Sequence, residues 1–192
     1  MVAGLSDREI SADILESCRR GDRDAFRVLY ETYKDKVYSI ALYFFHGDSS
    51  AASDTTQQVF LKLIRGVEQF RGEAGFSTWL YRLVVNACMD GARRAKPREL
   101  DGAIADMVAL SAPAAQEEDL ARRQIERSVQ TALSALPVKF RLPILLRYFD
   151  ELSYIEMASA MNCSMGTVAS RLNRGHKMLA RLLQDKRLEG IK

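Results

Sequence analysis

The sequence predicts an all-α protein of two small helical domains joined by a flexible linker. Apolar residues recur at three- and four-residue steps along almost the whole chain, as they do on one face of a helix. No segment alternates apolar and polar residues with a period of two for long enough to indicate a sheet. Residues 97–116 have little periodicity of either kind. The predicted domains are therefore residues 1–96 and 117–192, with the linker between them.

Three apolar stripes indicate three helices in the first domain. They cover residues 26–44, 59–67 and 76–88. Tyr30 and Ile64 belong to the first two stripes and are expected to be buried. Gly72 and Gly75 interrupt the pattern after the second stripe, so we expect a loop over residues 70–77. Pro97 ends the third helical region, because proline has no backbone N–H to donate.

The predicted linker differs in composition from its flanks. Residues 97–116 contain Ala, Gly, Ser and Pro with weak periodicity, although residues 104–110 could form a short helix. Between Glu99 and Asp119 the chain carries six acidic residues and no basic one. The helical pattern returns at Glu117. Pro137 and Pro143 are expected to punctuate the helices that follow.

Residues 152–175 indicate two consecutive helices with a tight break between them. Ser153 and Glu156 fit a capping box, in which each side chain satisfies a free backbone amide at a helix start. Ile155 then begins a short apolar stripe, and a break is expected at residues 162–163. Ser164 is well placed to cap the second helix. This pattern is typical of a helix-turn-helix, whose second helix enters the major groove of DNA.

The second of these helices carries polar residues on the face opposite its apolar stripe. Arginine there can pair bidentately with guanine edges, and lysine can contact phosphates. Basic residues outnumber acidic ones by 10 to 5 over residues 133–192, although the whole chain has a net charge of only +3. The alternative interpretation is an ordinary surface helix with scattered arginines. The candidate DNA contacts are Thr167, Ser170, Arg171, Arg174 and Lys177.

Composition argues against membrane insertion and against enzymatic chemistry. No run approaches the ~20 apolar residues that span a bilayer, and the N-terminus does not resemble a signal peptide, so we expect a cytoplasmic protein. Cys18, Cys88 and Cys163 share no metal-ligand spacing, and His46 and His176 are isolated. There is no phosphate-binding glycine-rich motif and no carboxylate pair with a base. We expect no metal, no cofactor and no catalytic residue.

Three sequence segments together resemble a known family. Residues 54–60 read DTTQQVF and residues 76–90 read FSTWLYRLVVNACMD, and they resemble region two of the sigma factors. Residues 152–175 read LSYIEMASAMNCSMGTVASRLNRG and resemble region four. The two regions occur in the family's order with no region three between them. Over roughly residues 20–96 and 117–184, the chain therefore resembles the extracytoplasmic-function (ECF) group of the sigma-70 family.

The resemblance implies a transcription initiation factor that binds core RNA polymerase and promoter DNA. It implies contacts with the clamp of the largest polymerase subunit and the flap of the second-largest subunit, with an anti-sigma factor as a further candidate partner. Asp54, Gln57 and Gln58 would bind the clamp, although Gln58 replaces a glutamate frequent in the family. The second domain would read the minus-thirty-five element. An autonomous helix-turn-helix regulator, which binds duplex DNA without polymerase, is the alternative.

The same resemblance assigns recognition and melting of the minus-ten element to the first domain. A base flipped out of the DNA would enter a pocket formed by the loop at residues 70–77 and Asn86. The polar face of the third helix would contact the unpaired strand. Trp79 lies on the apolar stripe and is expected in the core. The implied minus-ten contacts are Phe70, Arg71, Gly72, Ser77, Tyr81, Arg82, Asn86 and Arg93.

Overall fold

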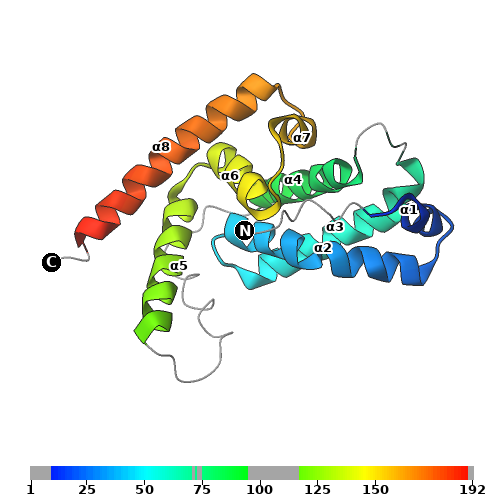
Figure 1. Cartoon of the computed structure of the whole chain (residues 1–192), viewed down its shortest axis with the longest axis horizontal. Coiled ribbons are helices and arrows are strands. Elements are labelled where there is room, and N and C mark those ends of the chain that lie inside the picture. The colour runs from blue at the N-terminus through cyan, green and yellow to red at the C-terminus, as the bar shows by residue number, and fades with distance from the viewer. Residues whose placement is uncertain (1–9, 71, 73–74, 95–116, 190–192) are drawn as a thin grey trace, which may run out of the picture.

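The computed structural model describes residues 10–70, 72, 75–94 and 117–189. Throughout these residues the regular structure is helical and contains no strand, which confirms the all-α prediction (Figure 1). The predicted linker at residues 97–116 and Arg71 lie outside the described residues. The elements are α1 (Ala12–Arg19), α2 (Arg23–Phe44), α3 (Ser49–Gly66), a 3-10 turn η1 (Val67–Gln69), α4 (Phe76–Arg94), α5 (Glu117–Ala135), α6 (Val138–Asp150), α7 (Tyr154–Ala160) and α8 (Met165–Glu189).

The first three helices begin at side chains that satisfy their free backbone amides. Ser11 caps α1, Asp22 caps α2 and Asp48 caps α3. Asp48 Oδ1, for example, accepts from the amide of Ala51 at 2.9 Å. Helix starts leave such amides without intrahelical partners, and Ser and Asp side chains are well suited to accept from them. The short helix α1 was not among the helices that the apolar stripes predicted.

Helices α2, α3 and α4 pack together around the three predicted stripes. Leu29, Leu63 and Leu80 are completely or almost completely buried, one on each helix. Two residues of the predicted stripes are not buried, however. Tyr30 and Ile64 are 42% and 48% exposed, so the prediction that they belong to the core is wrong. Both residues line the groove between α2 and α3, at the edges of their apolar stripes, where the two helices leave them uncovered.

In the C-terminal half, α6 is the central helix and packs against α8 and α2. Pro137 precedes α6 as predicted, but Pro143 lies inside the helix and does not end it. One backbone hydrogen bond is lost there, and burial of residues 140–146 outweighs that loss. Gly175 allows α8 to approach α6 closely. A Cβ at this position would lie 2.8 Å from Ile144 Cδ1.

The N-terminal helices α1–α4 and the C-terminal helices α5–α8 pack against each other and share one continuous core. Helix α6 lies against α2, α7 lies against α4, and α5 contacts α2 (Figure 1). Side-chain contacts other than those of Arg141 also cross this boundary. Lys36 forms an ion pair with Asp150, Arg82 donates to Ser159, and the rings of Tyr43 and Phe149 lie 5.0 Å apart between centroids.

Arg141 of α6 is the most buried charged residue at this boundary, with 4% of its surface exposed. Its Nη1 donates to the carbonyl of Phe44 at 2.6 Å, and its Nη2 donates to the carbonyls of Ser134 and Leu136 at 2.8 Å each. These carbonyls lie at the C-terminal ends of α2 and α5, and neither helix has a basic residue in its last turn. A helix C-terminus leaves carbonyls unpaired and carries partial negative charge. Arg141 therefore supplies the missing cation to two helices at once.

His46 lies next to this arginine, in the turn after α2. Its Nε2 is 3.0 Å from Arg141 Nη1 and must accept, because a guanidinium group has no acceptor. Burial, and secondarily the charge of Arg141, lower the pKa of His46 to about 4. The neutral imidazole is thus the form that the fold stabilises.

The lowered pKa predicts a loss of stability in mild acid. An unfolded histidine takes up a proton near pH ~6.5, whereas His46 in the fold does so only near pH 4. The unfolded state therefore binds more protons between these values, and the free energy of unfolding falls as the pH falls through this range. His46→Asn, which tolerates the positive φ of 61° at this position, should weaken this dependence. Urea unfolding near pH ~7.5 and ~5 measures the free energy of unfolding of wild type and of the His46→Asn variant. Equal pH dependence in the two proteins would contradict the prediction.

Candidate nucleic-acid interface

The predicted helix-turn-helix is present as α7, a short turn and α8. Ser153 Oγ accepts from the amide of Glu156 at 3.3 Å, and the amide of Ser153 donates to Glu156 Oε2 at 2.7 Å. This reciprocal pair is the predicted capping box. Met157 and Ala160 form the buried side of α7. The prediction that Ile155 joins this apolar stripe is wrong, because Ile155 is 68% exposed.

The turn between the two helices is formed by a left-handed residue and a second cap. Asn162 has a φ of 49°, in a region that asparagine adopts more readily than most residues. Ser164 Oγ accepts from the amide of Thr167 at 3.2 Å and lies 2.9 Å from Thr167 Oγ1. The predicted cap at Ser164 is thus confirmed. Helix α8 starts at Met165, which places its first turns immediately after the turn.

The N-terminal half of α8 has one buried and one accessible side. Val168 and Leu172 are 0% and 2% exposed and hold the helix against α6 and α7. The five candidate DNA contacts lie away from these two residues. Thr167 and Arg171 are half-buried, and Ser170, Arg174 and Lys177 are exposed.

Neither Arg171 nor Arg174 forms an ion pair or hydrogen bond with any side chain in the described part of the chain. Arginine side chains usually find carboxylate or carbonyl partners when these lie within reach. Two neighbouring guanidinium groups therefore remain available on an accessible helix face. Such groups can bind phosphates or guanine edges without first breaking a contact within the protein.

The residues implied in minus-ten recognition lie in two different environments. Arg82, Asn86 and Arg93 are exposed on α4, as expected. Tyr81 is fully buried, so the prediction that it lies on the DNA-facing side is wrong. Burial, and secondarily the nearby Asp150 carboxylate, raise the pKa of the Tyr81 hydroxyl. Because α7 covers part of α4, a position that looks polar in the sequence lies under a neighbouring helix.

The loop before α4 is anchored by aromatic packing. Phe70 is 8% exposed, and its ring lies 5.7 Å from Phe76 and 5.4 Å from Trp79 between centroids. Arg19 of α1 donates to the carbonyl of Phe70 at 2.6 Å. Phe70 therefore positions the loop by packing and presents little surface to a ligand. The loop is shorter than predicted, because α4 already begins at Phe76 and includes Ser77, which is half-buried.

Gly72 in this loop is exposed and has a φ of 74°. No atom lies within 4 Å of the position that a Cβ would occupy there. The constraint at Gly72 is thus its backbone conformation, which residues with a side chain adopt only at a cost.

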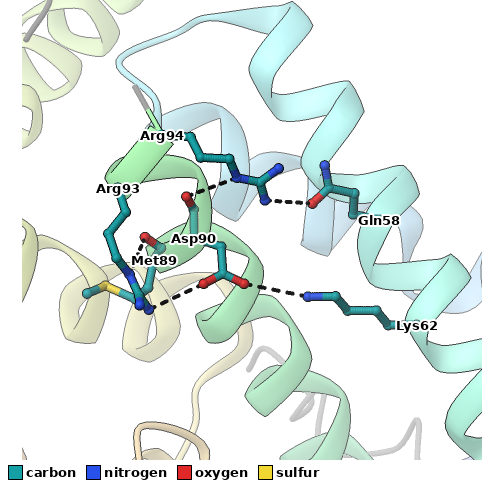
Figure 2. Close-up of polar contacts among 6 residues, drawn as sticks. All are labelled: Gln58, Lys62, Met89, Asp90, Arg93 and Arg94. Carbon is teal, nitrogen blue, oxygen red and sulfur yellow. Dashed lines mark hydrogen bonds and ion pairs between the residues drawn. The ribbon is translucent and has the colours of Figure 1, made fainter. Parts of the chain in front are cut away.

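A polar network connects the C-terminal end of α4 with α3 (Figure 2). Asp90 lies between two cations, with Oδ1 at 3.3 Å from Arg93 Nη2 and Oδ2 at 3.7 Å from Lys62 Nζ. Arg94 donates from Nη2 to Gln58 Oε1 at 3.4 Å. A glutamate at position 58 would pair with Arg94 as an ion pair, whereas the neutral glutamine gives only a weak hydrogen bond. Arg93 and Arg94 also donate from Nε to the carbonyls of Met89 and Asp90 at 3.3 Å each, so both guanidinium groups are held within this network.

The three implied polymerase contacts do not form one patch. Gln57 lines a groove of about 430 Å³ between α2 and α3, and Asp54 is exposed on the preceding turn of α3. Gln58 points instead to Arg94 of α4 (Figure 2). Sequence reasoning missed the apolar lining of this groove. It includes Tyr30, Leu61 and Ile64, which are 42%, 44% and 48% exposed.

The described residues contain no cluster of three or more His, Cys, Asp or Glu side chains arranged to hold a metal ion. None of the described helices combines the length and apolar character that a membrane span requires. Cys18 and Cys88 are buried and Cys163 is half-buried, and all three are free thiols. Burial raises the pKa of Cys88 to about 12, so its reactive thiolate form is suppressed.

Family models match both halves of the chain. The model of sigma-70 region 2 matches residues 29–98, which include α3 and α4. The model of sigma-70 region 4 matches residues 126–179, which include the helix-turn-helix. The ECF RNA polymerase sigma factor SigW of Bacillus subtilis is 34% identical over 89% of this chain and 95% of its own length. The chain belongs to the ECF sigma factors.

Two further relatives cover nearly the full length. The RNA polymerase sigma-H factor of Pseudomonas aeruginosa is 33% identical over 92% of this chain, and the ECF sigma-E factor of Escherichia coli is 31% identical over 94%. The aligned regions cover 95% and 97% of the lengths of these two relatives. This sigma factor therefore binds core RNA polymerase and promoter DNA and directs transcription initiation. Its family is not one known for enzymatic activity.

Solved structures share the fold at low sequence identity. CnrH, solved in complex with the cytosolic domain of CnrY, has a TM-score of 0.68 and 21% identity over 90% of this chain and 96% of its own. The sigma factor RpoE of Bartonella quintana, solved with the anti-sigma factor NepR, has a TM-score of 0.62 and 22% identity over 83% of this chain and 96% of its own. Both likenesses concern the arrangement of helices only.

Proposed function

We propose that α8 of this sigma factor reads the minus-thirty-five element through Thr167, Ser170, Arg171, Arg174 and Lys177. The observation that carries this proposal is a pair of arginines on α8 without a side-chain partner among the described residues, on a helix whose start is fixed by a cap. The N-terminal residues of a recognition helix contact base edges in the major groove. Arg171 and Arg174 are one turn apart and reach adjacent base pairs or phosphates, and Lys177 contacts the backbone further along.

The exposed side of α4 binds the minus-ten element in this proposal. Asn86, Gly72 of the loop and Ser77 at the start of α4 receive a base flipped out of the DNA, while Arg82 and Arg93 hold the backbone. Capture of an extruded base offsets the few kcal/mol that unstacking costs, so recognition and melting occur together. Phe70 contributes by positioning the loop, and Tyr81 by filling the core under it.

The groove between α2 and α3 docks on the clamp of the polymerase in this proposal. Its exposed Tyr30, Leu61 and Ile64 offer an apolar patch, Gln57 lines the groove, and Asp54 is exposed on the preceding turn of α3. Interfaces of this kind combine an apolar centre with a polar rim. Gln58 lies on the side facing α4 and does not enter this contact directly.

Transcription in vitro tests the proposal against an autonomous helix-turn-helix regulator. Core polymerase is incubated with a genomic DNA library, with and without the protein. Promoter-specific transcripts should appear only when both are present. An autonomous regulator would instead bind a duplex site tightly on its own and would not confer initiation on core polymerase.

Substitutions should separate docking from melting. Asn86→Ala is expected to leave polymerase association intact and to impair opening of the minus-ten region, because only the base pocket is lost. Asp54→Ala combined with Gln57→Ala should weaken association, because Gln57 lines the groove and Asp54 is exposed on the preceding turn of α3. A pull-down measures association and permanganate reactivity measures opening. If both variants were defective in the same step, the proposed separation of polymerase docking from minus-ten melting would be wrong.

The cellular setting follows from the partners. A factor that works on polymerase and chromosomal DNA is placed in the cytoplasm, and the phosphodiester chemistry belongs to the polymerase. An anti-sigma factor is a candidate regulator, because the similar fold of RpoE from Bartonella quintana was solved with the anti-sigma factor NepR. Co-purification from a cell that expresses the tagged protein tests this partner, and purification without a stoichiometric inhibitor would exclude it under those conditions.

A further inference from the structure

Several polar side chains on the accessible face of α8 are already engaged within the protein. Thr167 Oγ1 lies 2.9 Å from Ser164 Oγ, so this hydroxyl is part of the cap at the helix start. The hydroxyl of Ser170 donates to the carbonyl of Thr167 at 3.2 Å. Lys177 carries donors and no acceptor, and acts as a point charge suited to phosphate. None of these three residues therefore presents a free donor and a free acceptor side by side, as recognition of a single base requires.

Asn173 lies on the same face and was not among the predicted DNA contacts. It follows Ser170 by three residues and precedes Lys177 by four, so the three side chains line up along the helix. Asn173 is exposed, and its carboxamide forms no hydrogen bond with another described residue. Asparagine is a poor helix former, and no contact of the described fold favours it over alanine at this position inside α8. A free carboxamide is therefore held on the DNA-reading face at some cost to the helix.

A glycine at the start of α8 points to the same face. Gly166 is exposed and lies four residues before Ser170. A Cβ at this position would meet only Ser164 Oγ, at 3.9 Å, which is ordinary van der Waals contact. The fold thus has room for alanine at Gly166, although glycine destabilises a helix relative to alanine, whereas the approach of Ile144 does require Gly175. A glycine that the protein itself does not need is expected where another molecule comes close to the backbone.

The chemistry of a carboxamide matches one base in the major groove. Adenine presents the N7 acceptor beside the N6 amino donor, and a carboxamide presents a donor beside an acceptor, so the two pair bidentately. Guanine presents two acceptors and pairs with arginine instead. Asn173 directly precedes Arg174 in the sequence. One helical turn rises ~5.4 Å, which spans one to two base pairs at ~3.4 Å each, so the two side chains reach neighbouring bases.

We propose that Asn173 determines specificity in the minus-thirty-five element by pairing bidentately with an adenine, within about two base pairs of the contact made by Arg174. The carboxamide nitrogen donates to N7, and the carboxamide oxygen accepts from the N6 amino group. Gly166 lets the start of α8 approach the DNA closely enough for Asn173 to reach the base edge. The inference rests on the proposed role of α8, and it adds the base that one residue selects.

Transcription by the holoenzyme from a promoter library tests this assignment. The library is built on a promoter that the factor uses, with a randomised minus-thirty-five region, a constant minus-ten element and a transcribed barcode that identifies each promoter. Wild type should prefer adenine at one position of this region. Asn173→Ala should reduce that preference by about fivefold or more and leave the preferences at other positions unchanged. Asn173→Asp keeps the shape and loses the donor, so its preference should move to cytosine, whose N4 amino group needs only an acceptor.

Gln184→Ala is the matched control, because Gln184 is an exposed carboxamide of the same helix about 16 Å further along α8. It should leave every base preference unchanged. A second arm alters the DNA instead of the protein. At the selected position, 7-deazaadenine lacks the N7 acceptor and should lower wild-type transcription several-fold, with no further effect on Asn173→Ala. Because alanine is the better helix former, Asn173→Ala is expected to fold at least as well as wild type.

An unchanged adenine preference in Asn173→Ala would overturn the assignment. A loss of transcription spread evenly over all promoters would overturn it too, since that result indicates a contact with the DNA backbone. Equal sensitivity of wild type and Asn173→Ala to 7-deazaadenine would have the same meaning. Failure of the proposed function is a separate result. If Arg174→Ala also leaves every preference in the randomised region unchanged, α8 does not read this element at all.

Discussion

Replacement of both Arg171 and Arg174 by alanine is expected to abolish most promoter-specific transcription while core polymerase binding survives. Each arginine that pairs with a guanine edge contributes about 1–3 kcal/mol to recognition, which corresponds to a roughly 5- to 150-fold change. Neither has a partner within the described part of the protein, so removing it breaks no internal contact. The double variant should therefore fold normally and lose DNA recognition. Run-off transcription on a cognate promoter measures the loss.

Arg127→Ala is the matched control for this prediction. Arg127 is an exposed arginine of α5, in the same half of the protein, and its loss changes the net charge by the same amount as either single substitution, Arg171→Ala or Arg174→Ala. Its effect on transcription should be small, since it lies outside the helix-turn-helix. A salt titration of DNA binding distinguishes phosphate contacts from contacts with base edges, because loss of a phosphate contact reduces the salt dependence of binding. Wild-type transcription by the double variant at moderate salt would refute the role of α8.

Replacement of Arg141 by methionine is expected to lower the free energy of unfolding by about 3 kcal/mol, at about 1 kcal/mol for each of three carbonyls left without a donor. Methionine fills a similar length of apolar space, so the loss reports the polar contacts more than packing. Burial lowers the pKa of Arg141 to about 10, which still leaves it charged at neutral pH. Urea denaturation measures the change.

Lys139→Met on the same helix is the control, because it removes an exposed cation at an equally helical position. Its effect on the free energy of unfolding should be small, as is usual for surface substitutions. Equal destabilisation by the two substitutions would show that the contacts of Arg141 with the ends of α2 and α5 contribute no more than an ordinary surface charge.

Local chemistry explains the parts of the site that could be predicted from sequence. A capping box needs only residues three apart, so Ser153 and Glu156 identified the start of α7 before any fold was known. The same holds for Ser164 at the start of α8, and for the buried Val168 and Leu172 opposite the arginines. Periodicity also predicted helices α2, α3 and α4 and the absence of strands from the described residues.

Predictions that required knowledge of the neighbours of a helix were wrong. Tyr81 was assigned to a DNA-facing surface because it lies off the apolar stripe of residues 76–88, but α7 packs on α4 and Asp150 lies near the Tyr81 hydroxyl. Tyr30 and Ile64 were assigned to the core because they continue apolar stripes, yet no helix covers them and they border an open groove. Periodicity shows which face of a helix is apolar and not what covers that face.

The sequence by itself determined the helical class, the position of the helix-turn-helix, the candidate residues on its second helix and the resemblance to the ECF sigma factors, because each depends on residues close together in the chain. Only the tertiary structure decided how the two halves meet. Arg141 gave no sequence signal, since its partners Phe44 and Ser134 are recognisable only once the ends of α2 and α5 lie beside α6. The pairs Lys36–Asp150 and Arg82–Ser159 likewise join residues 114 and 77 positions apart. Contacts over such separations are set by the packing of whole helices, and no local pattern encodes them.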